Sequence, residues 1–129
     1  PHVQLGSRTI NAHKRGGKVV WFDFRELCDK PLSQNDYLEL AAMFHTIMVS
    51  DVPQMTPSMA SMARRFTLLV DVMYDRNVNL IASAAVPAEE LYTQGTLAHE
   101  FTRTVSRLHE MRSAEYLARE HRHVDISIT

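Results

Sequence analysis

The chain has 129 residues, of which 45% are hydrophobic and 22% are charged, and this suits one compact domain with its own core. A formal net charge of -1 argues against a dedicated nucleic-acid binder, which would carry a basic surface. The single cysteine, Cys28, excludes a disulfide framework, and the chain has neither an apolar run of about 20 residues nor a signal peptide. We therefore expect a soluble, cytoplasmic protein with at most peripheral membrane association.

A β-hairpin is predicted at the start of the chain. Two β-prone runs, Val3–Ala12 and Lys18–Phe24, flank the turn-forming segment Lys14–Gly17. The second run is almost continuously apolar, which indicates a strand in the interior of a sheet. Residues 1–30 therefore form a predicted hairpin region. Because this region begins right at Pro1, we expect the chain to have been cut from a longer protein.

A helix is predicted from about Asn35 to Met43. Pro31 interrupts the chain before it, and Ser33 can cap its amino terminus. Asp36 stands three residues after Ser33, where it can act as the acid of a capping box. Apolar residues then follow at helical spacing, which indicates that one face of this helix is buried.

Two apolar strands joined by a long helix are predicted in the centre of the sequence. The segment His45–Ser50 is a short β-branched run, and Val78–Ala84 is a second apolar run. Between them, Pro57 at the first helical position begins a helix that continues to about Arg76. A strand-helix-strand unit of this length implies adjacent parallel strands with a right-handed crossover. The sequence thus predicts an α/β fold over residues 33–112.

The carboxyl-terminal part is predicted to be helical. A short acidic helix spans Pro87–Tyr92, and Gly95 marks a turn before an amphipathic helix over Glu100–Arg112. A last short helix, capped by Ser113, and a loose tail are predicted over residues 113–129. The fold class predicted for the whole chain is therefore α/β, with an N-terminal β-hairpin, a parallel strand-helix-strand unit and C-terminal helices.

Motifs spread over most of the chain resemble those of one protein family. In chain order they are Trp21-Phe22-Asp23-Phe24, Leu27-Cys28, Asp36-Tyr37, Ala63-Arg64-Arg65-Phe66, Leu69-Val70-Asp71, Tyr74, Ser83-Ala84, Pro87, Phe101, Arg103, Ser106-Arg107-Leu108 and Glu110-Met111. Together they resemble the carboxyl-terminal third of the ZapE family of AAA-type ATPases, which are bacterial cell-division proteins with mitochondrial relatives. The resemblance implies that the fold is part of a P-loop ATPase.

The resemblance also implies ATP and Mg²⁺ as cofactors of the intact protein, held by a G-x-x-x-x-G-K-[ST] loop and an acidic strand. Neither is present in this chain, whose only glycine pair, Gly16-Gly17, lacks the following Lys-Ser or Lys-Thr and lies in a predicted hairpin. Without backbone amides and a lysine around the phosphates, ATP hydrolysis has no catalytic scaffold. We therefore expect this chain alone to be inactive and to hold neither nucleotide nor metal.

Two polar residues stand at the ends of the central strands, where open parallel sheets bind ligands. Asp51 follows the first strand, but Val52 and Pro53 come next where an Mg²⁺-binding strand would have a second acid. Ser83 lies at the end of the second strand and resembles the polar sensor of the γ-phosphate. Both are candidate cofactor-binding residues, and the alternative for each is an ordinary turn or cap residue.

The strongest candidates for a catalytic role are Arg107 and Arg103, which share one face of the last amphipathic helix. Like charges at i and i+4 repel by a few tenths of a kcal/mol, so an acid or anion should lie beside them. Arg107 stands in a Ser-Arg segment resembling those that carry an arginine finger, which stabilises phosphoryl oxygens at a neighbouring subunit. The alternative is local, with intrahelical ion pairs from Glu100 to Arg103 and from Glu110 to Arg107.

We expect the ends of both central strands to face the same way as these two guanidinium groups. The predicted function is that of a carboxyl-terminal segment in an ATP-hydrolysing cell-division protein, where it completes the fold and supplies inter-subunit arginines. Its expected partners are the rest of the ATPase chain, a division-ring protein and further copies of itself, with no nucleic acid. The alternative is a protein-interaction module that acts without nucleotide.

Overall fold

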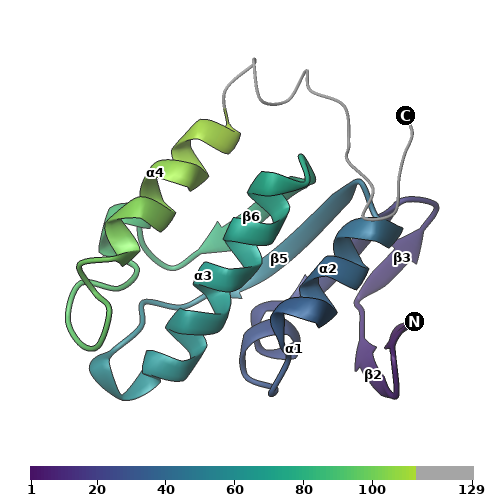
Figure 1. Cartoon of the computed structure of the whole chain (residues 1–129), viewed down its shortest axis with the longest axis horizontal. Helices are drawn as coiled ribbons and strands as arrows, with labels where there is room; N and C mark the ends of the chain where they lie inside the picture. The colour runs from purple at the N-terminus through teal and green to yellow at the C-terminus, as the bar shows by residue number, and fades with distance from the viewer. Residues whose placement is uncertain (113–129) are drawn as a thin grey trace.

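The computed structural model describes residues 1–112 and shows a mixed α/β fold with two sheets (Figure 1). Its elements are β1 (His2–Leu5), β2 (Arg8–Asn11), β3 (Lys14–Gly16), β4 (Val19–Asp23), α1 (Phe24–Cys28), α2 (Gln34–Met43), β5 (Thr46–Val52), η1 (Pro57–Met59), α3 (Ala60–Asp75), β6 (Asn79–Ala84), η2 (Ala88–Glu90) and α4 (Phe101–Met111). Within residues 1–112, none of the helices combines the length and the apolar character needed to cross a bilayer. The helix and tail predicted over residues 113–129 lie outside the described residues.

The amino-terminal part contains two hairpins rather than one. β1 and β2 pair antiparallel in a separate two-stranded sheet, and their turn includes Gly6 at a φ of 60°, which glycine adopts without strain. β3 and β4 form the second hairpin. The prediction of Val3–Ala12 as one strand is therefore wrong, because the chain reverses inside it at Gly6. Within the predicted turn segment Lys14–Gly17, the first three residues are strand β3 and only Gly17 belongs to the turn.

The main sheet has four strands in the order β3-β4-β5-β6. Its last three strands run parallel, and Val20, Ile47 and Leu80 stand opposite one another across them. β4 lies inside this sheet, as its apolar sequence predicts. β5 and β6 are neighbours connected through the long helix α3, so the parallel strand-helix-strand unit that the sequence predicts is confirmed.

Local sequence explains where the helices begin and end. At the start of α2, the Ser33 Oγ accepts a hydrogen bond from the Asp36 backbone N–H at 3.4 Å, and the Asp36 carboxylate accepts one from the Ser33 N–H at 2.8 Å. This is the predicted capping box. Pro57 opens a single turn of 3-10 helix, η1, that leads into α3. Asn77 separates α3 from β6 with a φ of 55°, in the left-handed region that asparagine tolerates.

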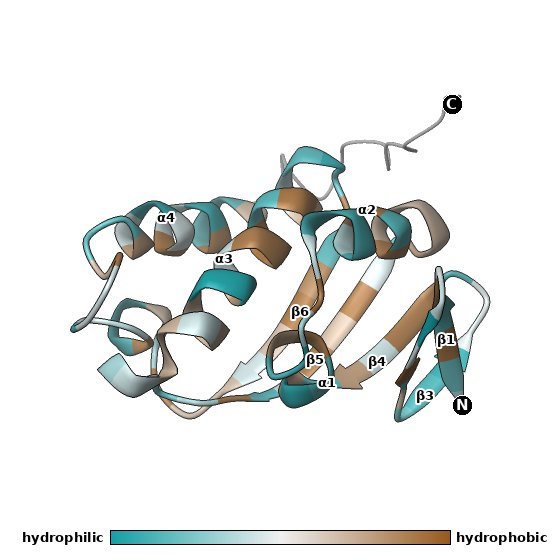
Figure 2. Cartoon of the chain, turned by 60° about the horizontal axis from the view of Figure 1, so that its bottom comes forward, coloured by the Kyte–Doolittle hydropathy of each residue, from teal (hydrophilic) through white to brown (hydrophobic). Residues whose placement is uncertain are grey.

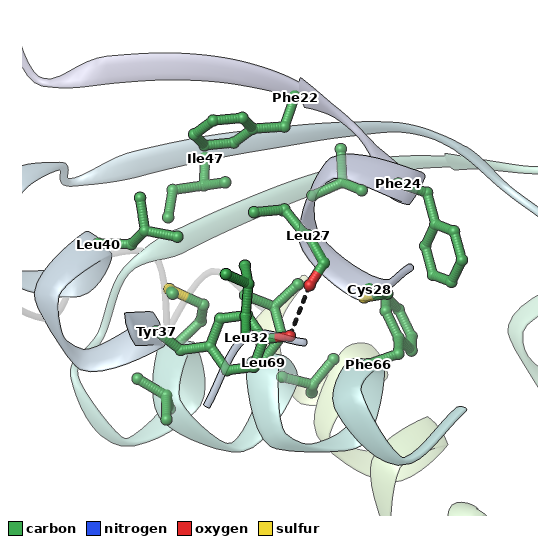
Figure 3. Packing of buried hydrophobic residues seen from close by; sticks show 14 of the residues in the cluster. Phe22, Phe24, Leu27, Cys28, Leu32, Tyr37, Leu40, Ile47, Phe66 and Leu69 are labelled. Atoms are coloured by element: carbon green, nitrogen blue, oxygen red, sulfur yellow. Dashed lines mark hydrogen bonds between the residues drawn. The ribbon is translucent and has the colours of Figure 1, made fainter. Parts of the chain in front are cut away.

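The core lies between the main sheet and the helices that cover one of its faces. Figure 3 shows Phe22 and Ile47 from the sheet facing Leu27, Tyr37 and Leu69 from α1, α2 and α3. The Tyr37 hydroxyl donates to the Leu27 carbonyl at 2.6 Å, so its polar end is satisfied inside the core. Burial raises the pKa of the Tyr37 phenol far above its ordinary value. The phenol therefore stays neutral and remains a hydrogen-bond donor.

Among the described residues, helices cover only one face of the parallel strands. Figure 2 shows α2, α3 and α4 on the same side of β4, β5 and β6. On the opposite face, Trp21, Met48 and Ile81 stand in register across the three strands. Trp21 and Met48 are half-buried, while Ile81 is 53% exposed. β6 is also an edge strand, so backbone groups along one of its sides point away from the sheet.

Candidate functional site

The structure brings Asp51 and Ser83 together near the carboxyl ends of β5 and β6. The register of the two strands shifts between Val49 and Val52, and Asp51 adopts a φ of 63°, in the left-handed region. The Asp51 backbone N–H donates to the Ser83 Oγ at 2.9 Å. Ser83 thus has a structural task, because its hydroxyl satisfies an amide that the bulge takes out of the strand ladder.

The strand-end pair keeps polar groups available for a ligand. Both residues are exposed, and a hydroxyl that accepts one hydrogen bond can still donate its own proton to another group. The Asp51 carboxylate can accept hydrogen bonds but cannot donate them when ionised. Over residues 1–112, the structure contains no group of three or more histidine, cysteine or acidic side chains that could hold a metal ion. The pair can therefore orient a polar group by hydrogen bonding.

Arg103 and Arg107 of α4 converge on one carboxylate of α3. The Arg107 Nη1 contacts the Asp71 Oδ1 at short hydrogen-bonding distance, and the Arg103 Nη2 lies 3.4 Å from the Asp71 Oδ2. Asp71 is therefore the acid that the two like charges require, in place of the intrahelical partners Glu100 and Glu110 that the sequence suggested. Two guanidinium groups therefore share the Asp71 carboxylate in this arginine cluster.

Arg107 is held more firmly than Arg103. Its guanidinium lies over the Tyr74 ring, 4.9 Å from the ring centre. The Tyr74 hydroxyl donates to the Glu110 Oε2 at 2.8 Å, which fixes the orientation of the ring. The side chain of Arg107 is only 24% exposed, whereas that of Arg103 is 68% exposed. The sequence alone did not predict that Asp71 and Tyr74 hold Arg107. Their spacing of three residues does place both on one face of a helix.

The arginine cluster and the strand-end pair are two separate sites. α3 connects two parallel strands and so runs antiparallel to them, as Figure 1 shows. Asp71 lies about one turn before the end of α3, toward the amino-terminal ends of β5 and β6. Asp51 and Ser83 lie at the opposite ends of these strands. The expectation that the strand ends and the guanidinium groups face the same way is therefore wrong.

A groove runs along β6, between this edge strand and α4. Its volume is about 560 Å³, and its walls are mainly apolar. β6 contributes Leu80 and Ala82, and α4 contributes Leu108 and Met111; among residues 1–112, Arg112 is the one charged residue in the lining. The groove adjoins the exposed edge strand of the sheet and has an apolar surface that an apolar segment could fill.

Comparison with known proteins gives the chain its family. Residues 1–120 match the sequence model of AFG1-like ATPases. The chain belongs to the AFG1-like ATPase family. It is 45% identical to the Cell division protein ZapE of Escherichia coli (strain K12) over 121 residues, which cover 94% of this chain and 32% of that protein. The chain thus spans about a third of the length of this curated relative.

Two further relatives are less similar to the chain. An uncharacterized protein of Schizosaccharomyces pombe is 39% identical over 90 residues, covering 70% of this chain and 20% of its own length. The Lactation elevated protein 1 homolog B of Danio rerio is 34% identical over 109 residues, covering 84% of this chain and 22% of its own length. No solved structure matches the chain at a significant level.

Several sequence motifs of this AFG1-like ATPase segment hold its helices together. The rings of Phe24 and Phe66 lie 5.9 Å apart, and those of Phe66 and Phe101 lie 6.3 Å apart, so aromatic contacts connect α1, α3 and α4. Arg65 donates from Nη1 to the Cys28 carbonyl at 3.1 Å, which ties α3 to the end of α1. These motif residues therefore have structural tasks, whereas Arg64 and Arg103 of the same motifs are exposed.

Proposed function

We propose that this chain is the carboxyl-terminal segment of an ATP-hydrolysing cell-division protein, where it completes the fold and offers Arg103 and Arg107 to a neighbouring subunit's nucleotide site. The half-covered parallel sheet carries this proposal. Parallel strands are almost always covered on both faces, whereas the helices among residues 1–112 cover only one (Figure 2). A further part of a longer ATPase would cover the open face, and the ZapE relative is about three times as long as this chain.

The motifs present in this segment and absent from it indicate which tasks it would perform in the intact protein. The sequence contains no G-x-x-x-x-G-K-[ST] motif, so the phosphates and Mg²⁺ would be held by the rest of the protein. Ser83 would donate a hydrogen bond at the ligand-binding edge of the sheet, beside Asp51. The arginine cluster would meet a second copy, because it lies away from that edge. We place the protein in the cytoplasm, with a division-ring protein as its partner.

Steady-state ATP hydrolysis by the intact protein tests the proposal. The double variant Arg103→Ala/Arg107→Ala should lower kcat by about 1,000-fold or more, since an arginine finger stabilises the transferring phosphoryl group. The Kd for nucleotide should change little, because the phosphates are held elsewhere. Arg64→Ala is the matched control, since Arg64 is also an exposed helix arginine and should leave kcat unchanged. Unchanged turnover in the double variant would reduce both residues to surface ion pairs.

The groove along β6 favours a second candidate function, a module that binds another protein without nucleotide. Thermal melting of the intact protein with and without Mg-ATP separates the two functions. A ligand that binds only the folded state raises Tm, by several degrees when it is far above its Kd. We expect such a shift for the ATPase, and an unchanged Tm would favour the interaction module.

A further inference from the structure

We infer that residues 124–128 of this chain dock on the main sheet as a strand parallel to β6 and fill the groove between β6 and α4. These residues lie outside the described part of the chain, so the inference joins their sequence to the surface that they would meet. It goes beyond the proposed function, because such docking requires neither a nucleotide nor a second subunit. It gives a binding site within this chain to a tail that the sequence alone predicts to be loose.

The two edges of the described main sheet differ in their charge. At one edge, β3 carries Lys14 and Arg15. Charged side chains on an edge strand oppose pairing with a further strand. At the other edge, β6 contains no charged residue, and its last four residues are exposed. Of these two edges, that of β6 is therefore the one suited to accept another strand.

Backbone groups along β6 are directed at the position of the docked strand. The Asn79 N–H donates to the carbonyl of His45, which directly precedes β5, at 2.9 Å. Because the N–H groups of successive residues in a strand point to opposite sides, those of Leu80 and Ala82 point away from β5. A strand placed beside β6 would accept hydrogen bonds from these two groups.

The direction of α4 fits a parallel strand on this side of β6. Its contacts with α3 follow the chain in the same order, from the Phe66 and Phe101 rings, 6.3 Å apart, to the Tyr74 hydroxyl, 2.8 Å from the Glu110 Oε2. α4 thus runs parallel to α3 and antiparallel to β5 and β6 (Figure 1). The residue after it, Arg112, lines the groove together with the first residues of β5 and β6. The chain therefore leaves α4 at the end of the groove where a strand parallel to β6 would begin.

The sequence of residues 124–128 suits both the edge and the groove. Val124, Ile126 and Ile128 are β-branched and alternate with Asp125 and Ser127. Alternation of this kind places the three apolar side chains on one face of a strand. Turned toward α4, that face would meet the apolar walls of the groove, while Asp125 and Ser127 would lie on the opposite face. The segment can therefore fill the groove without burying a charge in it.

The connecting chain is long enough for this docking. Residues 113–123 provide eleven residues between α4 and the docked strand, and an extended chain spans about 3.3 Å per residue. A strand reached from α4 in this way repeats the β5-α3-β6 connection, with the right-handed crossover that parallel strands almost always show. Because one edge accepts one strand, the docked segment would also keep a strand of another protein or of a second copy off β6.

Hydrogen exchange of backbone amides, read by NMR in the intact protein without nucleotide, tests the inference. Ile126→Asp should speed exchange at Leu80 and Ala82 by about 10-fold or more, because a carboxylate in the apolar groove would release the strand. Exchange at Asn79, which is bonded to the chain before β5, should stay unchanged. Ser127→Asp is the matched control, since it places the same charge on the opposite face of the strand and should keep the slow exchange.

Deletion of residues 121–129 supplies a second measurement. It should speed exchange at Leu80 and Ala82 as much as Ile126→Asp does, and sedimentation should show more self-association through the freed edge. Fast exchange at both amides in the wild-type protein would overturn the inference. Slow exchange that survives the deletion would overturn it as well, because another occupant would then cover the edge. That occupant would be a second copy if the protection depends on protein concentration, and another part of the intact protein if it does not.

Discussion

At the scale of single residues, Ser83 shows how one hydroxyl can serve the fold at a position where the sequence suggests a ligand. Its Oγ accepts the hydrogen bond of the Asp51 amide inside a strand bulge. Ser83→Ala should lower the free energy of unfolding by about 1 kcal/mol, because the amide loses its acceptor. Unfolding in urea measures this change in the free energy of unfolding. Ser106→Ala, at an exposed serine of α4, should be neutral, and equal stabilities for the two variants would remove the structural role of Ser83.

The arginine cluster marks the limit of residue-level prediction. The repulsion between Arg103 and Arg107 predicts that an acid lies nearby, and an acid does. Spacing along one helix points to Glu100 and Glu110 as that acid, whereas the structure supplies Asp71 from another helix. Contacts between helices depend on how the helices pack, and local spacing carries no information about that packing. The predicted roles of Arg103 and Arg107 at a nucleotide stay predictions.

At the scale of elements, Glu26 ties the amino-terminal hairpin to the helical layer. Its Oε1 accepts from the Asn11 backbone N–H at 2.9 Å and from the Lys30 Nζ at 2.8 Å, so β2 is joined to α1. Burial alone would raise the pKa of the Glu26 carboxyl, but the hydrogen bonds from Lys30 and Asn11 outweigh it and leave the pKa below its ordinary value of 4.5. The ionised form is therefore favoured by folding.

The pH dependence of unfolding tests this link. A carboxyl whose pKa falls on folding stabilises the protein above pH 4.5, and this contribution is lost as the pH drops through the folded pKa. Glu26→Gln should lower the free energy of unfolding at pH 7 by about 1 kcal/mol, with the difference shrinking in acid. Glu39→Gln, at an exposed position of α2, is the control. A difference that stays constant from pH 7 to pH 3 would contradict the role of ionisation.

Gly95 sets the path of the loop that leads into α4. Its φ is 121°, and a Cβ at this position would lie 2.7 Å from the Tyr92 Oη and 3.0 Å from the Pro57 Cα. The Tyr92 hydroxyl is itself engaged with the Thr96 carbonyl at 2.6 Å and cannot yield without loss. Gly95→Ala should therefore destabilise the protein by about 2 kcal/mol in denaturant unfolding. The matched control is Gly16→Ala.

Gly16 is the appropriate control because a Cβ there meets nothing within 4 Å. Its substitution should change the free energy of unfolding little, since the backbone conformation does not require glycine. If Gly95→Ala were as stable as Gly16→Ala, the loop would have room to shift, and the close approach to Pro57 would not determine the position of α4.

Element prediction succeeded where the local pattern fits one structure and failed where it fits two. The capping box of Ser33 and Asp36 starts α2 as predicted, because all its groups lie within one helical turn. The two apolar runs on either side of the long helix predicted the central parallel strands correctly, because each run lies within one short segment. The single strand over Val3–Ala12 was wrong because Gly6 permits a reversal that β propensity alone does not reveal. Because the chain reverses at that turn, β1 and β2 pair with each other in a separate sheet.

At the scale of the whole molecule, the open face of the main sheet is the feature that the sequence could not reveal. The apolar character of β4, β5 and β6 predicts burial on both faces, as parallel strands usually have. The described structure buries only the face that meets α1, α2 and α3. The apolar pattern of these strands therefore supports the proposal that a further part of a longer protein covers the open face, as does the share of the ZapE relative that the chain covers.

A substitution of Ile81 tests whether the open face is covered in the intact protein. Ile81 lies on this face and on the edge strand, with 53% of its surface exposed. Ile81→Lys should lower the Tm of the intact protein and lower its free energy of unfolding by about 2 kcal/mol or more, since a lysine would replace an apolar side chain in a covered interface. In this chain alone, the same charge should reduce self-association through the unpaired edge, measured by sedimentation. Leu97→Lys is the control, because Leu97 is 49% exposed but lies outside the sheet. A wild-type Tm for the intact Ile81→Lys protein would show that nothing covers the open face.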